Sequence, residues 1–579
     1  MSKLPLIIGL GGINAAGRSS GHHGYKRMVA ESLHDTDMAS TWTDLSNRMR
    51  IKAIDEKLQS SHIENAKAGT LIRRISLFDT NNVQINKKFN SNEAANLLQS
   101  DTTPFPVSSA GQIPEGFDIG TGYKSKNHPR GMCLTIYSAS DLVSSLGISW
   151  ETLTSLTSPD KIAVYASSAL GQIDQFSLAG LVGSPLNGGR VSSKMLPLSM
   201  PDMPANFVNS YVLNSLGTTT ACLGACASFL YNLKRGVDDI KQGKANICIV
   251  GTAEAPIERN VIAGFAAMGA LAEDHQLRKL DGSEHTNNRR ATRPFSTNAG
   301  FTIAESGQFV MLMSDELALE CGANVLGALP DVFINADGNK KSISSPGVGN
   351  YITMMKAAAL GDALLAGKLN QTYVQAHGTG TPQNRVTESH IINEVAKTYG
   401  LSDWRVTSIK SYVGHSIGSA AGDQLASVLG AWQYGWLPGI KTIDHIADDV
   451  YQSNLDILMQ DQAFDLGQNE VPATIINSKG FGGNNASALV LSPQQTMAML
   501  KQKHGETIMT HWRNKNESVA QKSRDNDIRA VHGDEPMVYN FGNDLLDYED
   551  LTFSKESIQI KGQKQSIKMP DSSEFNSYL

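Results

Sequence analysis

The sequence predicts an α/β fold built of two similar halves. The chain has 579 residues, of which 40% are hydrophobic and 18% charged, so it can bury a large core. Short apolar runs that end in small residues recur along it, which is typical of strands buried on both faces of a sheet. Segments with helical spacing lie between these runs, and this alternation occurs twice.

The N-terminal half is expected to span residues 1–323. Residues 1–12 hold a short apolar run that leads straight into glycines, and we interpret this run as a buried strand and not as a secretory signal. Residues 19–126 form a more polar insertion, of which residues 32–99 have a largely helical, surface-lying pattern.

Two central strands of this half are predicted at Lys161–Tyr165 and Ala245–Val250. A helix is expected between them, directly behind Cys226. Its apolar stripe consists of Leu230, Leu233, Val237 and Ile240.

The C-terminal half is expected to span residues 324–492. Buried-strand runs at Thr372–Gln375 and Ala473–Ile476 alternate with a helix of small residues at Ile352–Gly367. No clear repeat of the first half is visible residue by residue.

The chain becomes polar and charged in residues 493–579, which predicts a peripheral helix followed by an extended or partly ordered tail. If this extension is peripheral, removing it after Gly505 should spare the chemistry.

Composition excludes several classes of function. The net charge of -6 argues against nucleic-acid binding, which needs a basic surface. No stretch approaches the roughly 18 uninterrupted apolar residues of a membrane span. The five cysteines are odd in number and scattered, and none forms part of a zinc pattern. A protein of the cytoplasm with reduced thiols is therefore expected.

One cysteine lies where a nucleophile is expected. Small residues surround Cys226 in the segment Thr218–Leu230, and the cysteine comes at the start of the predicted helix. Backbone N–H groups and the positive end of a helix dipole favour a thiolate at such a position. An isolated cysteine is more often a buried packing residue, so the interpretation depends on the other motifs.

Three further segments carry functional side chains. His377 lies at a predicted strand end in Val-Gln-Ala-His-Gly-Thr-Gly-Thr-Pro, and His415 enters a small-residue helix in Lys-Ser-Tyr-Val-Gly-His. Phe481 is the one large aromatic of the glycine-rich loop Gly-Phe-Gly-Gly. Each motif alone is weak, because most histidines and glycine-rich turns are structural.

Together and in this order, these four motifs resemble those of the β-ketoacyl synthases of the thiolase-like superfamily. The resemblance covers about residues 4–492, weakly across residues 19–126, and leaves out the tail. It implies a thiolase-like fold with a five-layered αβαβα core, and an enzyme that requires neither an organic cofactor nor a metal.

The resemblance also implies roles for the motif residues. Cys226 would take an acyl group from a thioester, with the N–H groups of Cys226 and Phe481 forming an oxyanion hole. His377 and His415 would donate hydrogen bonds to a malonyl thioester as CO2 leaves, and the resulting enolate would attack the acyl group.

Supporting roles follow in the same way. Lys410 and Glu305 match positions that hold the site together through ionic hydrogen bonds. Thr379 and Thr381 match hydroxyls that bind the phosphopantetheine arm, and Phe481 matches an aromatic that gates the acyl pocket.

The chain departs from the usual motifs at Asn384, Arg385, Lys479 and Asn484, which bears on pocket shape and thioester preference. Its opening segment, long insertion and tail resemble the FabY-type synthases. That branch is associated with starting fatty acid biosynthesis from acetyl-CoA and malonyl-acyl-carrier protein.

Other functions are less consistent with the sequence. An elongating synthase that uses acyl-carrier primers stays open. A non-catalytic synthase-like partner should lack the nucleophile, a thiolase would use a second cysteine in place of one histidine, and a thiol protease would use one histidine with Asn or Asp.

Gly9–Gly17 lacks the acidic partner of a dinucleotide site. His22 and His23 are interpreted as a packed or solvated pair.

The resemblance implies a homodimer and docking of an acidic acyl carrier protein. By charge alone, the basic residues that could meet this carrier are Arg73, Arg74, Lys124, Lys126, Arg289 and Arg290.

Overall fold

The computed structural model describes residues 3–48, 73–74, 105–114, 117, 119–120, 122–342, 345–534, 537–543, 545–573, 576 and 578. Most of the predicted helical insertion at 32–99 therefore lies outside the described residues, apart from helix α2 (Asp35–Arg48) and the short strand β3 (Arg73–Arg74).

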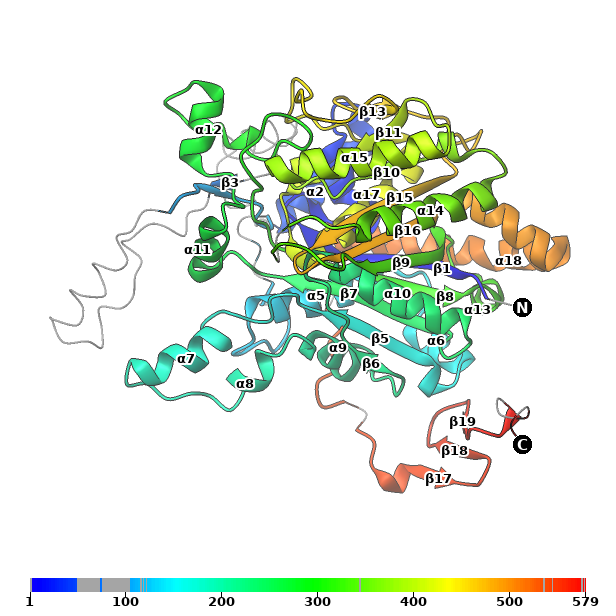
Figure 1. Ribbon diagram of the computed structural model, residues 1–579. Coiled ribbons are helices and arrows are strands. Elements are labelled where there is room, and N and C mark those ends of the chain that lie inside the picture. Colours follow the sequence, from blue (N-terminus) through cyan, green and yellow to red (C-terminus); the bar gives the residue numbers. More distant parts are fainter. Residues whose placement is uncertain are drawn as a thin grey trace.

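The strands of the two halves repeat one topology (Figure 1). The first half contains, in chain order, β1 (Pro5–Asn14), β5 (Ile162–Ser167), β6 (Thr219–Thr220), β7 (Ile247–Glu254) and β8 (Ser306–Ser314). The second contains β9 (Gly327–Ala336), β10 (Tyr373–Gln375), β11 (Trp404–Thr407), β15 (Ala473–Gly480) and β16 (Asn484–Leu491), with β13 (Leu455–Ile457) at its edge.

In space the first set runs β1-β8-β7-β5-β6 and the second runs β9-β16-β15-β10-β11. If the five strands of each set are numbered in chain order, both sets have the spatial order 1-5-4-2-3. Leu6 pairs with Ala328 and Ile7 with Gly327, so β1 and β9 join the two sets into one 12-stranded sheet. This sheet also includes β2 (Gly17–Arg18), which pairs with β1.

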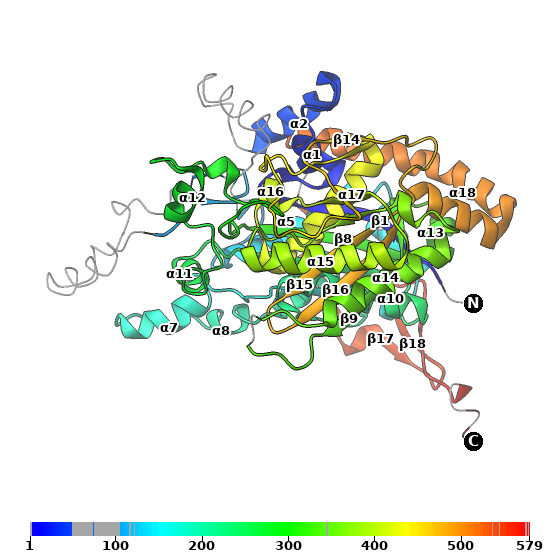
Figure 2. The ribbon, with the colours of Figure 1, turned by 45° about the horizontal axis from the view of Figure 1, so that its top comes forward.

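Helices form three layers around these strands. α10 (Ser228–Lys241) and α17 (Ala420–Tyr434) pack against each other between the two sets of strands, while α5 (Arg130–Ser145) covers β1 and β8. On the opposite side α14 (Gly349–Leu365) covers β9 and β16 and packs on α15 (Pro382–Thr398) (Figure 2). The five-layered thiolase-like fold predicted from the sequence is confirmed.

Burial explains why these segments were recognisable. β5, β7 and β8 are buried along their whole lengths, as expected for strands covered on both faces. The four residues of the predicted apolar stripe on α10 are each 0% exposed.

Smaller elements complete the chain. Further helices are α1 (His23–Met28), α6 (Trp150–Leu156), α7 (Leu178–Leu186), α8 (Met195–Leu198), α9 (Met203–Val208), α11 (Arg259–Ala267), α12 (Asp274–Asp281), α13 (Asp315–Cys321) and α16 (Lys410–Val413). Short strands are β4 (Ser109–Ala110), β12 (Trp436–Leu437) and β14 (Gln462–Ala463). Among helices of the described residues, none is long and apolar enough to cross a membrane.

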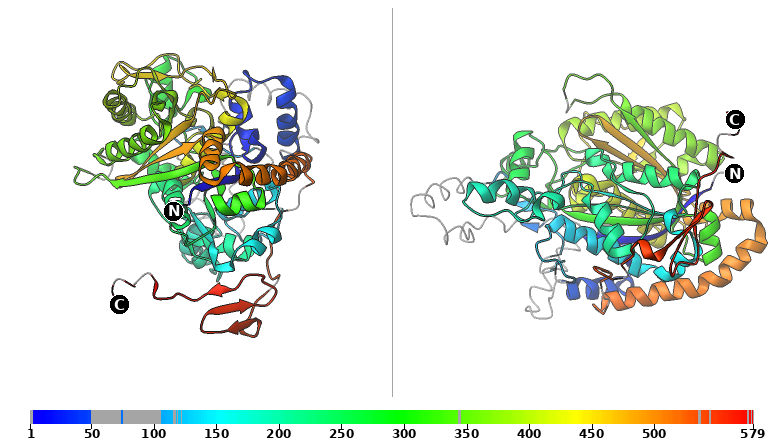
Figure 3. Two further views of the ribbon diagram at one scale, coloured as in Figure 1. Left: turned by 90° about the vertical axis from the view of Figure 1, so that its right-hand side faces the viewer. Right: turned by 90° about the horizontal axis from the view of Figure 1, so that it is seen from below.

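The C-terminal extension is more closely integrated than the sequence indicated. α18 (Pro493–Val531) bends at Gly505, and beyond the bend Met509 is buried and Trp512 donates to the carbonyl oxygen of Ala323. The peripheral part is the small sheet of β17 (Leu551–Phe553), β18 (Ser557–Ile560) and β19 (Ile567–Lys568), which lies apart from the sheet core (Figure 3).

The far end of α18 contacts the N-terminal residues. Arg18, 1% exposed, donates to Asp44 at 2.9 Å and to Asp527 of α18 at 2.6 Å. His23 is also buried and lies 3.1 Å from Asp527, while burial lowers the pKa of His22 to about 4. This pair of histidines is packed against protein.

Candidate active site

Cys226 lies in a strained turn at the start of α10. The short helix η8 (Ala225–Ala227) leads directly into α10, and Ala225 has a φ of 50°, a left-handed conformation that is uncommon for a residue with a side chain. The second half repeats this arrangement, because η11 (Ile417–Ser419) leads into α17 with a φ of 48° at Ile417. Strain of this kind persists only where surrounding packing fixes it, and it often accompanies functional sites.

Two backbone N–H groups point at the sulfur of Cys226. They belong to Cys226 itself and to Phe481, which follows the end of β15. The approach of β15 depends on Gly480, since a Cβ atom there would lie 2.1 Å from the carbonyl oxygen of Gly224. The carbonyl oxygen of an acyl group attached to Sγ of Cys226 could accept both hydrogen bonds.

His415 is the side chain in direct contact with the nucleophile. Its Nε2 lies 3.2 Å from Sγ of Cys226. Its ring packs edge-on against Phe301, with centroids 5.0 Å apart, and its backbone bonds to Thr302 and Ala304 fix the loop that carries it.

His377 follows the end of β10 and is held through its backbone. Its N–H donates to Glu388 of α15 at 2.7 Å, the N–H of Gly378 donates to the same carboxylate at 2.8 Å, and Lys410 donates to its carbonyl oxygen. Gly378 has a φ of +47°, and a Cβ there would lie 2.1 Å from Oγ of Ser408. The glycine in the motif therefore allows the turn that positions His377.

Glu388 is the functional carboxylate that sequence reasoning missed. Besides the two backbone groups, its oxygens accept hydrogen bonds from Asn384 and Asn477, both at 2.8 Å. Its negative charge is also the first of those that raise the pKa of Lys410. The available signal was its spacing, eleven residues after His377 in the sequence.

Glu305, by contrast, does not belong to the network that sequence analysis assigned to it. Its carboxylate accepts from Nε of Arg130 at 2.7 Å and from the N–H of Ile113 at 3.0 Å, and it is absent from the lining of the pocket that holds Cys226. The prediction that Glu305 provides the carboxylate of a network with Lys410 is wrong. Glu388 provides the negative charge beside Lys410 instead.

The electrostatics differ from the expected free thiolate. Burial raises the pKa of the Cys226 thiol to about 12, which outweighs the lowering effects of Lys410 and the two N–H groups. Burial and the charge of Lys410 lower the pKa of both His377 and His415 well below 6.5. The resting site therefore pairs a protonated thiol with two neutral imidazoles.

Lys410 itself is buried deeply, 1% exposed, and burial lowers its pKa to about 8 in spite of the nearby negative charge of Glu388. It reaches the site through the backbone of His377 and through its charge, and it does not line the cavity.

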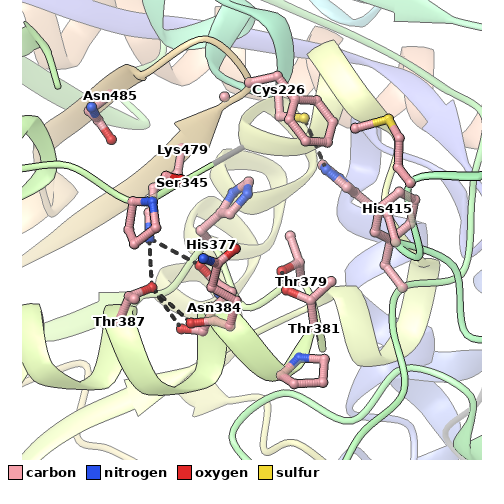
Figure 4. Close-up of a pocket in the computed structure, with 18 of the residues that line it drawn as sticks. Cys226, Ser345, His377, Thr379, Thr381, Asn384, Thr387, His415, Lys479 and Asn485 are labelled. Atoms are coloured by element: carbon pink, nitrogen blue, oxygen red, sulfur yellow. Dashed lines mark hydrogen bonds between the residues drawn. The ribbon is translucent and has the colours of Figure 1, made fainter. Parts of the chain in front are cut away.

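Cys226 and both histidines open onto one cavity of about 370 Å³ (Figure 4). Thr379 and Thr381 line the same cavity, with their hydroxyl oxygens 3.2 Å apart, and Phe481 forms part of its wall beside Phe265. On the side of Cys226 the wall is apolar. It includes Phe301, and the buried residues Phe265, Leu271 and Ile417 belong to the same hydrophobic cluster as Cys226.

The four departures from the usual motifs are all accommodated by local bonds. Arg385 makes a bidentate ion pair with Asp449, both contacts being 2.8 Å, and so lies outside the catalytic contacts. Asn484 donates to the carbonyl oxygen of Phe481 at 2.6 Å and thus stabilises the loop of the oxyanion hole. Asn384 and Lys479 line the cavity itself.

No group of three or more histidine, cysteine or carboxylate side chains suited to holding a metal ion occurs among the described residues. The chemistry available to the site is that of a thiol, two imidazoles and aimed N–H groups.

Residues 124–318 match the β-ketoacyl synthase N-terminal domain, and residues 326–444 match the β-ketoacyl synthase C-terminal domain. The chain belongs to the β-ketoacyl synthase family. It is 41% identical, over the whole of both chains, to the β-ketoacyl-acyl-carrier-protein synthase FabY of Pseudomonas aeruginosa, which confirms the predicted branch.

Solved structures agree with this assignment. The crystal structure of the ketosynthase FabY from P. aeruginosa has a TM-score of 0.92 and 40% identity, and the match covers 100% of this chain and 99% of that one. A β-ketoacyl synthase from Burkholderia phymatum shares the fold, with a TM-score of 0.60 and 20% identity over 85% of this chain and 99% of that chain.

A more distant relative is the 3-oxoacyl-acyl-carrier-protein synthase 2 of Staphylococcus aureus. It is 29% identical over 399 residues, which cover 67% of this chain and 89% of that protein. The chain is thus a ketoacyl synthase, an acyltransferase.

Proposed function

We propose that this synthase starts fatty acid biosynthesis by condensing an acetyl group on Cys226 with malonyl-acyl-carrier protein to give acetoacetyl-acyl-carrier protein. The full-length similarity to FabY supports the carrier-protein substrate. Close packing of Phe265, Phe301 and Ile417 around the nucleophile favours a short acyl group.

The single observation that carries the proposal is the contact of 3.2 Å between His415 and Cys226. Because burial keeps the thiol protonated, His415 accepts its proton as the sulfur attacks the thioester carbonyl. The developing oxyanion accepts hydrogen bonds from the backbone N–H groups of Cys226 and Phe481. The C–S bond of the donor then breaks, and its thiolate takes the proton back from His415.

Condensation follows at the same cavity. After acylation, exchange with solvent moves the ring proton of His415 from Nδ1 to Nε2, so that both neutral imidazoles present an N–H to the cavity. The bond between the malonyl methylene and its carboxylate then breaks, CO2 leaves, and the electron pair forms an enolate whose oxygen accepts hydrogen bonds from the N–H groups of His377 and His415. The enolate carbon attacks the acetyl carbonyl, and Sγ of Cys226 leaves as the thiolate. One proton from solvent restores the thiol. The remaining residues act around these atoms, with Thr379 and Thr381 holding the pantetheine arm and Phe481 gating the acyl side.

Partners are proposed on the same basis. Acetyl-CoA is the primer donor, and the carrier protein docks near exposed basic residues. Lys124, Lys126 and Arg289 are exposed, whereas Arg290 is bonded to Asp444 and to the carbonyl oxygen of Thr442. Of Arg73 and Arg74 only the backbone is described.

We also propose a homodimer in the cytoplasm. β6 lies at an edge of the large sheet, and the leucines on either side of it, Leu216 and Leu223, are each 47% exposed. α7 projects from the body of the molecule at the lower left of Figure 1, and its Val182 is 57% and its Leu186 81% exposed. An open strand edge flanked by exposed apolar side chains is suited to a protein interface. None of the five cysteines, all of them within the described residues, forms a disulfide, in keeping with the compartment.

The decisive experiment supplies purified protein with acetyl-CoA or with acyl-carrier thioesters of increasing length, together with malonyl-acyl-carrier protein. Acetoacetyl product from acetyl-CoA, and acetylation of the wild type but not of Cys226→Ala, are expected. Product only from longer carrier-bound primers would support the elongating alternative, and absence of any acylation would contradict the proposal.

A further inference from the structure

The charges that line the cavity are unbalanced in the described part of the chain. The charged side chains of the described lining are those of Asp337, Lys340 and Lys479. Lys340 forms an ion pair with Asp337 at 3.3 Å. Lys479 has no carboxylate within ion-pair distance among the described residues, so with both histidines neutral the lining has an excess of one positive charge.

Neutral oxygens hold the Lys479 ammonium in place. Nζ donates to Oδ1 of Asn384 at 3.3 Å and to Oγ1 of Thr387 at 3.1 Å, both on the first turns of α15 (Figure 4). Asn384 in turn donates to Glu388. The lysine is therefore oriented by a chain of hydrogen bonds, while one of its three N–H donors is left for a ligand.

The position of Lys479 is close to the reacting centre. It precedes Phe481, whose N–H points at Sγ of Cys226, by two residues, and its charge is one of those that lower the pKa of His377. Burial also lowers the pKa of Lys479 itself, and the charges of Glu388 and Asp337, which act on it without forming an ion pair, offset only part of this effect.

We propose that Lys479 binds the carboxylate of the malonyl unit and so selects a carboxylated extender over its decarboxylated counterpart. This inference rests on the proposed function. One methylene separates the thioester carbonyl of a malonyl unit from its carboxylate, so a carbonyl held at His377 and His415 leaves the carboxylate within reach of a neighbouring side chain. The phosphate of the pantetheine arm is the other anion that could use this cation, but it lies at the far end of a long arm.

The contact acts on binding and not on the bond that breaks. The negative charge on the carboxylate disappears as CO2 leaves, so the interaction is stronger with the bound substrate than with the transition state. Removing the ammonium should therefore raise KM for malonyl-acyl-carrier protein about tenfold and leave kcat unchanged or higher.

The test uses non-hydrolysable amide analogues of malonyl- and acetyl-phosphopantetheine, which differ in the carboxylate. Calorimetric titration of the wild type should show about tenfold tighter binding of the malonyl analogue, a difference of ~1.4 kcal/mol. In Lys479→Met the preference should fall below about twofold, and Lys479→Arg should keep most of it. Lys356→Met, an exposed lysine of α14, is the matched control and should behave as wild type.

Repeating the titrations with analogues that lack the phosphate separates the two anions. If Lys479→Met weakens both phosphorylated analogues equally and leaves the dephosphorylated pair unaffected, the lysine binds phosphate and the inference is overturned. Unchanged preference for the malonyl analogue in Lys479→Met overturns it as well. Failure of the proposed function would look different, because wild-type protein would then form no acetyl-Cys226 and no condensation product.

Discussion

The imidazole ring of His415 stands at 90° to that of His377, with the two ring centroids 5.4 Å apart. Of the two rings, only that of His415 lies within hydrogen-bonding distance of the sulfur of Cys226. The two histidines therefore have unequal parts in the two half-reactions.

Replacing each histidine by alanine should separate those parts. His377→Ala should still acetylate Cys226 within about threefold of the wild-type rate but lose at least 10²-fold in decarboxylation, because one enolate hydrogen bond is lost. His415→Ala should lose both steps, since it also removes the base. Mass spectrometry of the acyl-enzyme and release of labelled CO2 measure the two steps independently; equal acylation defects in both variants would contradict the assignment.

Cys226→Ala should abolish condensation but still decarboxylate malonyl-acyl-carrier protein. The substitution leaves His377 and His415 in place, and these groups stabilise the enolate without the sulfur. The enolate then takes a proton from solvent, so the product is acetyl-acyl-carrier protein. Absence of CO2 release in a folded Cys226→Ala protein would show that the cysteine takes part in decarboxylation.

The rate of acylation should stay nearly constant from pH 6.5 to pH 7, which lies below the pKa of about 8 of Lys410. Burial lowers the pKa of His415 well below 6.5, so the ring is neutral and able to accept the thiol proton throughout this range. The acid limb of the rate profile should therefore lie below pH 6.5, as measured by stopped-flow acetylation of Cys226. A midpoint at or above pH 6.5 would mean that the ring is more solvated than its burial indicates.

Glu388→Gln should harm the protein far more than Glu305→Gln. All four hydrogen bonds to Glu388 come from N–H donors, so an amide NH2 would face donors and leave buried groups unsatisfied, at a cost of about 1–3 kcal/mol. Loss of activity at 25 °C and a lower urea midpoint are expected. In Glu305→Gln one oxygen still accepts hydrogen bonds, so turnover should stay within a few-fold of wild type. A larger loss of turnover in Glu305→Gln than in Glu388→Gln would show that Glu305 belongs to the catalytic network.

Gly480→Ala should reduce kcat about 10²-fold in a folded protein. The added Cβ would meet the carbonyl oxygen of Gly224, so β15 must retreat and take the Phe481 N–H away from Cys226. Gly482→Ala, in the same loop but without a close atom other than Asn484 at 3.4 Å, is a control for strain at a positive φ. Similar losses in both variants would point to loop strain and not to the oxyanion hole.

Asp527→Asn should destabilise the protein by about 2 kcal/mol at pH 7, because it weakens a largely buried ion pair with Arg18. Burial alone would raise the pKa of Asp527, but His23 and Arg18 outweigh it and lower the pKa far below its ordinary value. The stabilisation is therefore complete above the unfolded pKa near ~4 and is lost as pH falls toward the folded one. Urea titrations of both proteins from pH 7 to pH 3 should show the gap narrowing; a constant gap would exclude the ion pair as its source.

The buried strands and the apolar stripe of α10 could be predicted from the sequence, because the spacing of hydrophobic residues is a local property. The clustering of Cys226, His377 and His415 could be predicted because the motifs that carry them, and the order of these motifs, can be read directly in the sequence. The sequence was insufficient for Glu388, which is recognisable only when α15 folds back to bring its carboxylate under the His377 turn. The raised thiol pKa was missed for a similar reason, since burial depends on neighbours distant in the chain.

The extension after Gly505 shows the same limit. Its polar composition indicated a peripheral segment, yet Met509, Trp512 and Asp527 make specific contacts with the core. Truncation at this point should therefore lower the stability of the protein, while the prediction that it spares the chemistry stays a prediction.

The paired left-handed turns at Ala225 and Ile417 show that one structural solution is used twice for different ends. They occupy equivalent places in two halves with one strand order. One half carries the nucleophile and the other carries the two imidazoles. Neither half holds the whole set of reacting groups, so the cavity between them depends on both.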